Sequence, residues 1–186
     1  MRSKPVLREE RSEDPDEVAA VRDLVRAAFG GDKVPTLLDA LRESDGWLDL
    51  VHVLEEGDEI VAALCYSRGW LDAPDKLVEV LVLSPMAVRP DRQRAGLGSL
   101  LVRESLQAIG SRPEPLVFLE GAPDFYSRLG FIAGSELRFT PPSVRIPGPA
   151  FQVATLPGYE QAWMHGALVY PDVWWRQDAV GLRPER

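Results

Sequence analysis

The sequence predicts an α/β fold in which helices flank a mixed central sheet. Strand-like and helix-like apolar spacings follow one another in the order strand, two helices, three strands, helix, strand, helix and further strands. Within this order, a strand, a helix entered through a glycine-containing turn and a following strand form a βαβ unit. The chain has 186 residues, of which 45% are hydrophobic, and this is enough for the core of one compact domain.

The N-terminal part of the chain predicts a strand over residues 5–11 and an amphipathic helix over 15–29. Asp14 is a suitable N-cap, Pro15 fits the first helical position, and Glu17 can reach back toward the helix start. The apolar residues that follow recur at helical spacing until two glycines end the pattern. The segment 34–44 predicts a second, shorter helix.

The middle of the chain predicts three strands. Two of them lie on either side of Glu56, Gly57 and Asp58, a sequence that favours a hairpin turn. The third covers residues 76–88 and is almost continuously apolar, which is typical of a central strand buried on both faces.

The second half of the chain predicts a helix over residues 97–109, a strand over 115–121 and a short helix over 122–130. The apolar residues of the first helix fall on about half of its surface, and Gly130 is suited to end the second helix. The C-terminal region is rich in Pro, Gly and aromatic residues. It contains two further strands, in FQVATL and GALVY, and a short helix in PDVWWRQDA.

Composition limits the function. The formal net charge of −8 argues against general binding of nucleic acid, which needs a broad basic surface. A single cysteine excludes an internal disulfide, and two histidines with scattered carboxylates give no metal-ligand spacing, so no metal is expected. We find no apolar segment suited to a signal peptide or a membrane span, and we therefore expect a cytoplasmic protein without a membrane partner.

The segment AVRPDRQRAGLG, residues 87–98, concentrates positive charge and glycine in an otherwise acidic chain. Backbone N–H groups at a helix start have no intrahelical partner, and they converge with the positive end of the helix dipole. Glycine at 96 and 98 removes the Cβ atoms that would block close approach, and Arg92 and Arg94 add positive charge. The turn therefore predicts an anion site suited to a diphosphate.

Two familiar nucleotide-binding patterns do not fit this turn. The dinucleotide fingerprint needs a third glycine, but Leu101 stands at that position. A phosphate-binding loop that ends in Gly-Lys-Ser/Thr is also absent from the sequence. A glycine-containing turn before a helix is common in proteins, so the spacing alone does not establish phosphate binding.

Two motifs resemble one enzyme family. The segment from Gln93 to Gly98 is similar to the Gln/Arg-x-x-Gly-x-Gly/Ala signature of the GCN5-related N-acetyltransferases (GNAT). The segment FYSRLGF, residues 125–131, resembles the Tyr-x-x-x-Gly-Phe element that follows it in the family. The C-terminal FQVATL and GALVYP segments resemble, more loosely, a subgroup of predicted acetyltransferases with a longer C-terminal β region.

The resemblance implies acetyl-CoA (CoA) as co-substrate and a sheet that is splayed at the cofactor strand. The diphosphate would lie on the turn, and the pantetheine arm would lie along the backbone of Met86, Ala87 and Val88, where one amide could polarise the thioester carbonyl. Pro85 lacks an N–H group and is expected to help end regular strand pairing. The cofactor-binding residues of the turn are then Gln93, Arg94, Ala95, Gly96, Leu97, Gly98 and Ser99.

The same resemblance assigns Tyr126 as the acid that protonates the leaving thiolate, although packing beside Phe125 would also explain this tyrosine. Glu79 is our first choice for the general base, because it is the charged residue inside an apolar strand, where desolvation would raise its pKa. An ion pair with a basic side chain is the alternative role for Glu79. Glu120, at the end of the next strand, is the second choice for the base.

Other reactive side chains favour structural roles. Cys65 lies in an apolar strand and is expected in the core, and His52 alternates with two valines, which predicts a surface position. His165 could line the acceptor pocket. The aromatic side chains near the C-terminus either form a wall of an acceptor site or, as we prefer, fill the core; they are Trp163, Tyr170, Trp174 and Trp175.

We therefore expect residues 1–186 to form a single N-acetyltransferase domain, with 5–132 as its core and 133–186 as strands that complete the sheet and the acceptor site. The enzyme would transfer acetyl from acetyl-CoA to a primary amine of a small molecule or peptide by direct attack. A CoA-binding sensor without turnover is one alternative, and a nucleotide-binding enzyme of another fold is a second. The identity of the acceptor and the formation of a homodimer stay open.

Overall fold

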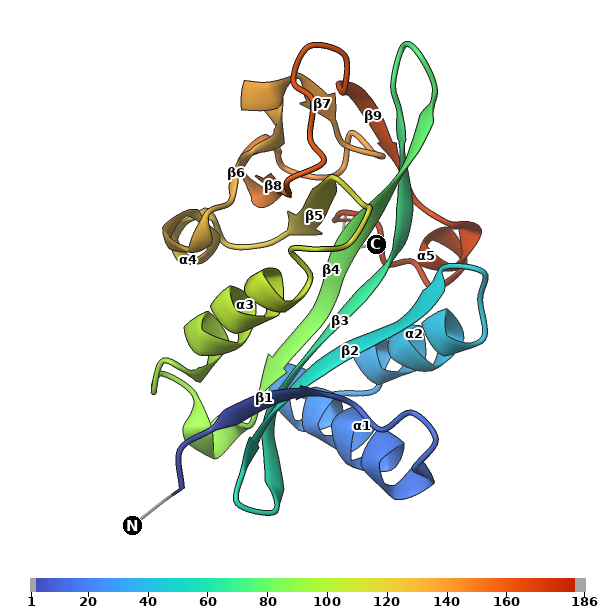
Figure 1. Cartoon of the computed structure of the whole chain (residues 1–186). Helices are drawn as coiled ribbons and strands as arrows, with labels where there is room; N and C mark the ends of the chain where they lie inside the picture. Colours follow the sequence, from blue (N-terminus) through green and yellow to red (C-terminus); the bar gives the residue numbers. More distant parts are fainter. Residues whose placement is uncertain (1–2, 183–186) are drawn as a thin grey trace. The chain divides into compact units, whose positions relative to one another are not determined.

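The computed structural model describes residues 3–182 (Figure 1). These residues form two compact units. The first unit contains residues 3–67 and 83–109, and the second contains 68–82 and 110–182. Strands β3 (Glu59–Asp72) and β4 (Leu77–Val88) each contribute residues to both units.

The first unit carries the N-terminal elements and the helix that follows β4. Besides its parts of β3 and β4, it comprises β1 (Val6–Glu9), α1 (Pro15–Phe29), α2 (Lys33–Arg42), β2 (Trp47–Glu56), the 3₁₀ turn η1 (Pro90–Arg92) and α3 (Leu97–Ala108). Strands β1 and β2 pair antiparallel, as do β2 and β3, and the hairpin between β2 and β3 turns at Gly57, whose φ is +67°.

The second unit holds the remaining elements. It comprises β5 (Leu116–Glu120), α4 (Pro123–Tyr126), η2 (Ser127–Leu129), β6 (Ile132–Ala133), η3 (Gly134–Leu137), β7 (Phe139–Thr140), η4 (Gly148–Ala150), β8 (Phe151–Thr155), β9 (Gly166–Val169) and α5 (Asp172–Arg176). Strand β5 pairs parallel with β4 and antiparallel with β8, which in turn pairs with β6. Strand β9 pairs antiparallel with the end of β3 and parallel with β7.

The hydrogen-bonded strand order β1-β2-β3-β4-β5-β8-β6 mixes parallel and antiparallel pairs, which confirms the predicted mixed sheet with flanking helices. The strands and helices expected from the sequence are all present, with ends that move by a few residues. Strands β6 and β7 were not expected, because two residues are too few to produce a periodic pattern.

Helix α1 begins and ends where the sequence predicts. The Asp14 carboxylate accepts a hydrogen bond from the Asp16 N–H at 3.0 Å, and Pro15 occupies the first turn. Gly30 ends the helix in the left-handed conformation, with φ of +71°, and its N–H donates to the Arg26 carbonyl.

The two faces of β2 meet different helices in the first unit. Val51 and Val53 pack with apolar side chains of α1 and α2, whereas His52 points to the opposite face, because successive side chains of a strand alternate. There the His52 Nδ1 lies 2.7 Å from the Ser105 hydroxyl of α3, which donates to the Tyr66 hydroxyl at 2.8 Å. His52 is only 3% exposed, so the predicted surface position is wrong: a polar partner on α3 satisfies the buried ring.

Cys65 is buried in the first unit with the valines of β2, which confirms its predicted core position. Burial disfavours the charged thiolate and raises the pKa of the Cys65 thiol to about 12. The thiol therefore stays protonated at neutral pH and is not a nucleophile.

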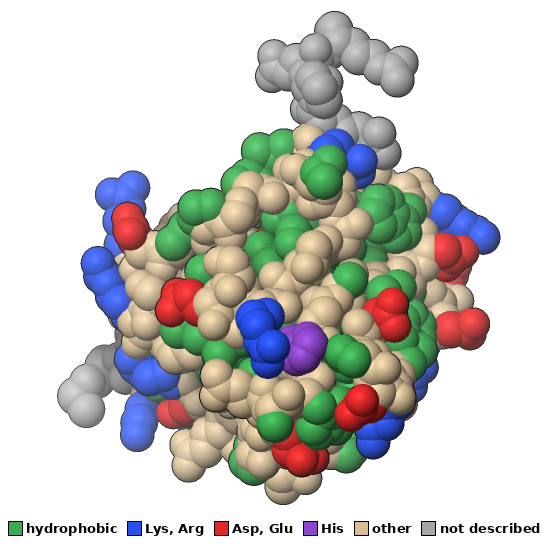
Figure 2. Space-filling model, turned by 90° about the horizontal axis from the view of Figure 1, so that it is seen from above, with side chains coloured by type: hydrophobic (Ala, Val, Ile, Leu, Met, Phe, Trp, Pro, Cys, Tyr) green, Lys and Arg blue, Asp and Glu red, His purple; other side chains and the backbone are tan. Residues whose placement is uncertain are grey.

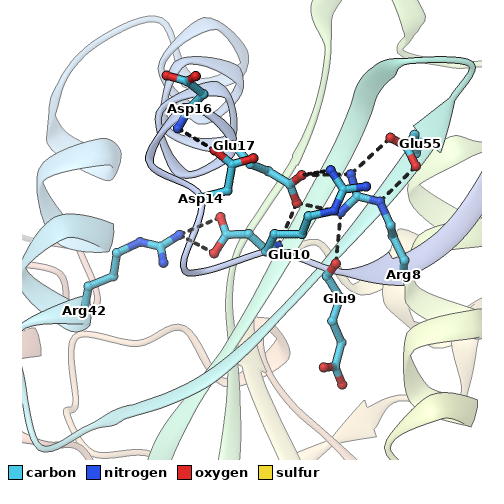
Figure 3. A network of polar contacts seen from close by, with 9 residues as sticks. Arg8, Glu9, Glu10, Asp14, Asp16, Glu17, Arg42 and Glu55 are labelled. Carbon is cyan, nitrogen blue, oxygen red and sulfur yellow. Dashed lines mark hydrogen bonds and ion pairs between the residues drawn. The ribbon is translucent and has the colours of Figure 1, made fainter.

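A polar network joins β1 to the start of α1 (Figure 3). The Glu17 carboxylate accepts hydrogen bonds from the Arg8 guanidinium, at 2.5 and 3.0 Å, and from the Arg11 N–H at 2.8 Å. Glu17 thus reaches back beyond its own helix to the chain that precedes it. The Arg8 guanidinium beside it lowers the pKa of this buried carboxyl group.

We predict that Glu17→Gln lowers the free energy of unfolding by about 2 kcal/mol at pH 7, because it removes a buried charge partner of Arg8. The native pKa of Glu17 is lowered, so its contribution is complete above the unfolded pKa of about 4.3 and is lost as the pH falls through the native value. Urea unfolding at pH 7 and below pH 4 measures both effects.

The matched control is Asp16→Asn, because Asp16 is an exposed carboxylate in the same helical turn. This change should cost less than about 1 kcal/mol. Equal losses for the two variants, or a Glu17→Gln loss that does not shrink at low pH, would contradict the assigned role of Glu17.

Candidate functional site

The turn between β4 and α3 brings backbone amides to an open helix start. Gly96 is the N-cap of α3 and has a left-handed conformation with φ of +82°, which a residue with a Cβ rarely adopts. No side chain caps the helix, and its first intrahelical bond runs from the Leu100 N–H to the Gly96 carbonyl at 3.0 Å. The amides of Leu97, Gly98 and Ser99 therefore lie at the open end of the helix dipole.

The space in front of Gly96 is free. A Cβ built on Gly96 would have no heavy atom of the described chain within 4 Å. The Gln93 side-chain amide donates to the Val88 carbonyl at 3.2 Å and so ties the turn back to the end of β4. Arg94 also has a positive φ, +61°, and its exposed side chain enters no ion pair with residues 3–182. These features suit an anion that approaches the backbone closely.

Arg92 does not take the role that the sequence suggested for it. Its side chain is 9% exposed, and its guanidinium forms a two-pronged ion pair with Glu56 in which one N–O distance is 3.0 Å. Glu56 raises the pKa of Arg92, and the pair fixes the turn on the β2–β3 hairpin. Arg92 therefore holds the turn in place, and its charge is neutralised by Glu56. The positive potential at the turn comes from the backbone amides and from Arg94.

The end of β4 contains the predicted cofactor strand. Ala87 is buried in the core of the first unit, while Met86 and Val88 are half-buried. The Ser84–Pro85 peptide bond is cis. Strand β4 continues past Pro85 to Val88, whereas its pairing with β5 is found at Leu81 and Val82, before Pro85.

In the second unit, Tyr126 ends helix α4 and lies against the end of β5. A Cβ built on Gly121 would lie 2.4 Å from Cε2 of Tyr126, so the absence of a side chain at 121 makes room for the ring. The ring also makes edge contacts with Phe125 and Phe131. Burial of the phenol raises the pKa of Tyr126 to about 12, so the hydroxyl stays protonated at neutral pH.

Glu79 is not enclosed as its apolar neighbours suggested. Its side chain is 44% exposed, and it forms an ion pair with Arg68 at 2.9 Å. Burial on both faces of β4 is confined to residues 80–83 in this part of the strand. The burial of Glu79 expected from the sequence is therefore wrong, because the first residues of this apolar strand lie near its exposed start. The alternative, an ion pair with a basic side chain, is what the structure shows.

A pocket of about 430 Å³ lies beside Glu79 within the second unit. Its lining includes Lys76, whose Nζ atom lies 5.0 Å from the centre of the Trp163 ring in a cation–π contact. Trp163 thus forms a pocket wall. Tyr170 and Trp174 are buried and stacked at 5.0 Å, which confirms the preferred core prediction for these two. The core prediction is wrong for Trp175, which is 39% exposed.

Glu120 has an environment that sequence reasoning did not foresee. The Tyr170 hydroxyl donates to the Glu120 carboxylate at 3.2 Å. Taken over all its atoms, Glu120 is exposed at the end of the strand. Its carboxylate is partly desolvated, and this desolvation raises the pKa of Glu120. The hydrogen bond from Tyr170 opposes that shift. The partner lies 50 residues further along the chain, so no local sequence signal pointed to it.

The charged surface is mixed in sign. Figure 2 shows acidic and basic side chains interspersed with hydrophobic ones on one face of the molecule. Among residues 3–182, no helix is long and apolar enough to cross a membrane, and no three His, Cys, Asp or Glu side chains gather as metal ligands.

Comparisons with known proteins agree on one family. The family model described as an acetyltransferase (GNAT) domain matches residues 9–134. An uncharacterized N-acetyltransferase, YjhQ of Escherichia coli K12, is 26% identical over 123 residues, which span 63% of this chain and 66% of that protein.

Solved structures show the same fold. The GNAT family N-acetyltransferase YhbS from Escherichia coli, solved in complex with CoA, matches with a TM-score of 0.82 and 24% identity over 97% of each chain. A GNAT family acetyltransferase from Brucella melitensis, in complex with acetyl-CoA, has a TM-score of 0.70 and 24% identity over 92% of this chain and 98% of that chain.

Proposed function

Because the chain belongs to the acetyltransferase (GNAT) family, whose members are acetyl-CoA-dependent N-acetyltransferases, we propose that it transfers acetyl from acetyl-CoA to a primary amine. The amine attacks the thioester directly, without an acyl-enzyme intermediate. The observation that carries the proposal is the uncapped start of α3 at Gly96, which offers free amides in an open turn. The buried, protonated thiol of Cys65 agrees with direct attack.

The residues of the turn fit the diphosphate of CoA. Its binding residues are Gln93, Arg94, Ala95, Gly96, Leu97, Gly98 and Ser99, of which the last three have amides at the helix start. Bound there, acetyl-CoA supplies an acetyl group activated as a thioester. The exposed Arg94 side chain can pair with a phosphate oxygen, whereas Arg92 is held by Glu56.

The backbone of Met86, Ala87 and Val88 is the proposed support for the pantetheine arm. An amide of this strand segment that points at the thioester carbonyl would stabilise the negative charge that develops on its oxygen. The burial of Ala87 fixes the segment, since the core of the first unit closes around its side chain.

Tyr126 is the proposed acid for the leaving thiolate. Its raised pKa keeps the proton on the phenol, but it also makes transfer to a thiolate, with a conjugate-acid pKa of about 8.5, unfavourable on its own. Transfer becomes feasible when two steps are coupled. The phenol gives its proton to sulfur, and at the same time the phenol takes up the proton that the attacking nitrogen loses.

A carboxylate is the proposed general base that makes the attacking amine neutral. Glu79, chosen first from the sequence, could act only after its Arg68 partner moved away, and Glu120 is the second candidate. Residues 1–186 would act as one N-acetyltransferase domain, in which 133–186 contribute to the acceptor site; Trp163 in the pocket wall supports this. A cytoplasmic location stays a prediction.

Release of free CoA from acetyl-CoA, measured with a panel of small amines and peptide N-termini, tests the function. An active enzyme releases CoA only in the presence of an acceptor. Tight CoA binding without release for any amine would instead favour a CoA-binding sensor. Protection against thermal unfolding by ATP, and none by CoA, would favour a nucleotide-binding enzyme of another kind.

We predict that Gly96→Asp weakens CoA binding at least about tenfold, because it places a side chain and a negative charge in the open space before the amides. Isothermal titration calorimetry with CoA measures the effect. Gly148→Asp is the control, since Gly148 is exposed and also has free space around a Cβ. Unchanged affinity in the Gly96 variant would contradict the diphosphate site.

We predict that Tyr126→Phe lowers kcat by about 100-fold and leaves the dissociation constant of acetyl-CoA nearly unchanged, because the ring and its packing remain while the acidic proton is lost. Steady-state kinetics and direct binding separate the two quantities. Phe125→Leu tests packing beside Tyr126 without touching the hydroxyl. Normal turnover of Tyr126→Phe would remove this tyrosine from the mechanism.

A further inference from the structure

We infer that the pocket beside Trp163 binds an organic ammonium ion, which takes the place of the Lys76 side chain on the Trp163 ring. All the residues that line this pocket belong to the second unit. The inference goes beyond the proposed function and does not depend on acetyl transfer. It follows from the contact that the ring already makes, the charge and apolar surface of the lining, and the place of the pocket on the sheet.

The face of the Trp163 ring is already occupied by a cation. The Lys76 Nζ atom lies 5.0 Å from the ring centre, within the distance at which the negative face of an indole attracts an ammonium group. Lys76 is exposed, and its ammonium group forms no ion pair with residues 3–182. A flexible, exposed lysine held by such a contact can swing into solvent. Lys76 therefore shows which kind of group the ring accepts, and it can give up its place to another.

The charged groups of the lining favour a cation over an anion. Besides Lys76, the lining contains the carboxylates of Glu79 and Glu114. Arg112 donates to both oxygens of Glu114, at 2.9 and 2.5 Å, whereas Arg68 binds Oε1 of Glu79 at 2.9 Å. Glu79 is 44% exposed, so its carboxylate can accept a second cation beside Arg68. An anion would instead face both carboxylates and the negative face of the indole ring.

The rest of the lining is apolar, and hydrogen bonds hold its backbone and its methionine. Leu77 is a large apolar side chain that is 59% exposed, and the sulfur of the buried Met164 accepts a hydrogen bond from the Glu160 N–H at 3.4 Å. The Pro115 carbonyl accepts from the Leu156 N–H at 2.8 Å. A volume of about 430 Å³ lies in the range of pockets for small organic ligands. An apolar group attached to the ammonium would cover Leu77 and remove its surface from water.

The pocket is distant from Tyr126, the proposed acid. Its lining includes Pro115, directly before β5, whereas the Tyr126 ring lies against Gly121, directly after β5. From position 115 to position 121, at a rise of about 3.3 Å per residue, the strand covers about 20 Å. An ammonium ion in the pocket is therefore too far from Tyr126 to be the reacting nitrogen. It belongs either to the remote end of a long acceptor or to a separate molecule.

Titration with the hexyltrimethylammonium ion, followed by NMR without acetyl-CoA, tests the site. This quaternary ion has no N–H group and cannot be acetylated. We expect saturable shifts of the Gly158 backbone amide and the Trp163 indole N–H, because both residues line the pocket. Hexanoate and hexan-1-ol should each bind at least about tenfold more weakly, since neither carries a positive charge. No saturable shift with the ammonium ion, or equal affinity for either control compound, would overturn the inference.

Two variants should change the affinity for hexyltrimethylammonium in opposite directions. Lys76→Gln removes the competing ammonium group, so the dissociation constant should fall about threefold. Trp163→Leu keeps an apolar wall but removes the aromatic face, so the dissociation constant should rise at least about tenfold. Lys33→Gln is the matched control, because Lys33 is an exposed lysine of the first unit and the change in net charge is the same. An affinity of Lys76→Gln no higher than that of Lys33→Gln, or an unchanged affinity of Trp163→Leu, would contradict the inference.

The CoA-release assay decides where the ammonium group comes from. A long diamine and the monoamine of the same length are compared as acceptors in the wild type and in Trp163→Leu. A larger rise of KM for the diamine would assign the ammonium group to the remote end of the acceptor, and equal effects on both would assign it to a separate ligand. Either result supports the pocket as an ammonium site. A protein that releases no CoA with any amine would overturn the proposed function and leave the NMR result standing.

Discussion

The start of helix α3 is the constraint on which the proposed chemistry depends. A helix leaves its first amides without intrahelical partners, and here no side chain supplies a cap. The left-handed conformation of Gly96 and the free space before it keep those amides accessible. The turn is held rigid by contacts that leave the amides alone, namely the Gln93 side chain on the Val88 carbonyl and the Arg92–Glu56 ion pair. Arg92 therefore serves to shape the turn, and in the proposed site the backbone amides and Arg94 are the groups that would bind the anion.

Burial acts on two titratable side chains of the second unit, the Tyr126 phenol of α4 and the Glu120 carboxylate at the end of β5. The consequences differ, because one is a phenol and the other a carboxylate. Burial keeps the Tyr126 proton in place over the physiological range, and it makes Glu120 a better proton acceptor than a solvated carboxylate. In the proposed mechanism Tyr126 is the acid, and Glu120 is one of two candidates for the base; acid–base catalysis at neutral pH requires such opposed roles. Tyr170 links the C-terminal segment to this arrangement.

Local sequence signals predicted the features that depend on local physics. The capping of α1 by Asp14 and Gly30, the hairpin at Gly57 and the glycine turn before α3 all follow from residues within a few positions of one another. The features that the sequence did not reveal depend on distant partners. His52 is buried because Ser105 lies opposite, Arg92 is neutralised by Glu56 from 36 residues away, and Glu120 meets Tyr170 from 50 residues away. Apolar periodicity indicates which face of a strand is buried. It does not indicate whether a hydrogen-bonding partner for a polar side chain lies on that face.

Whether the amides at the start of α3 hold the diphosphate of CoA, as we propose, can be measured at those atoms. Backbone amide resonances of Gly96, Leu97, Gly98 and Ser99, followed by NMR during titration with CoA and separately with pantetheine, report the contact directly. We expect large shifts of these amides with CoA and little change with pantetheine, which lacks the diphosphate. Unchanged resonances at saturating CoA, or the same shifts with pantetheine, would contradict the proposed site.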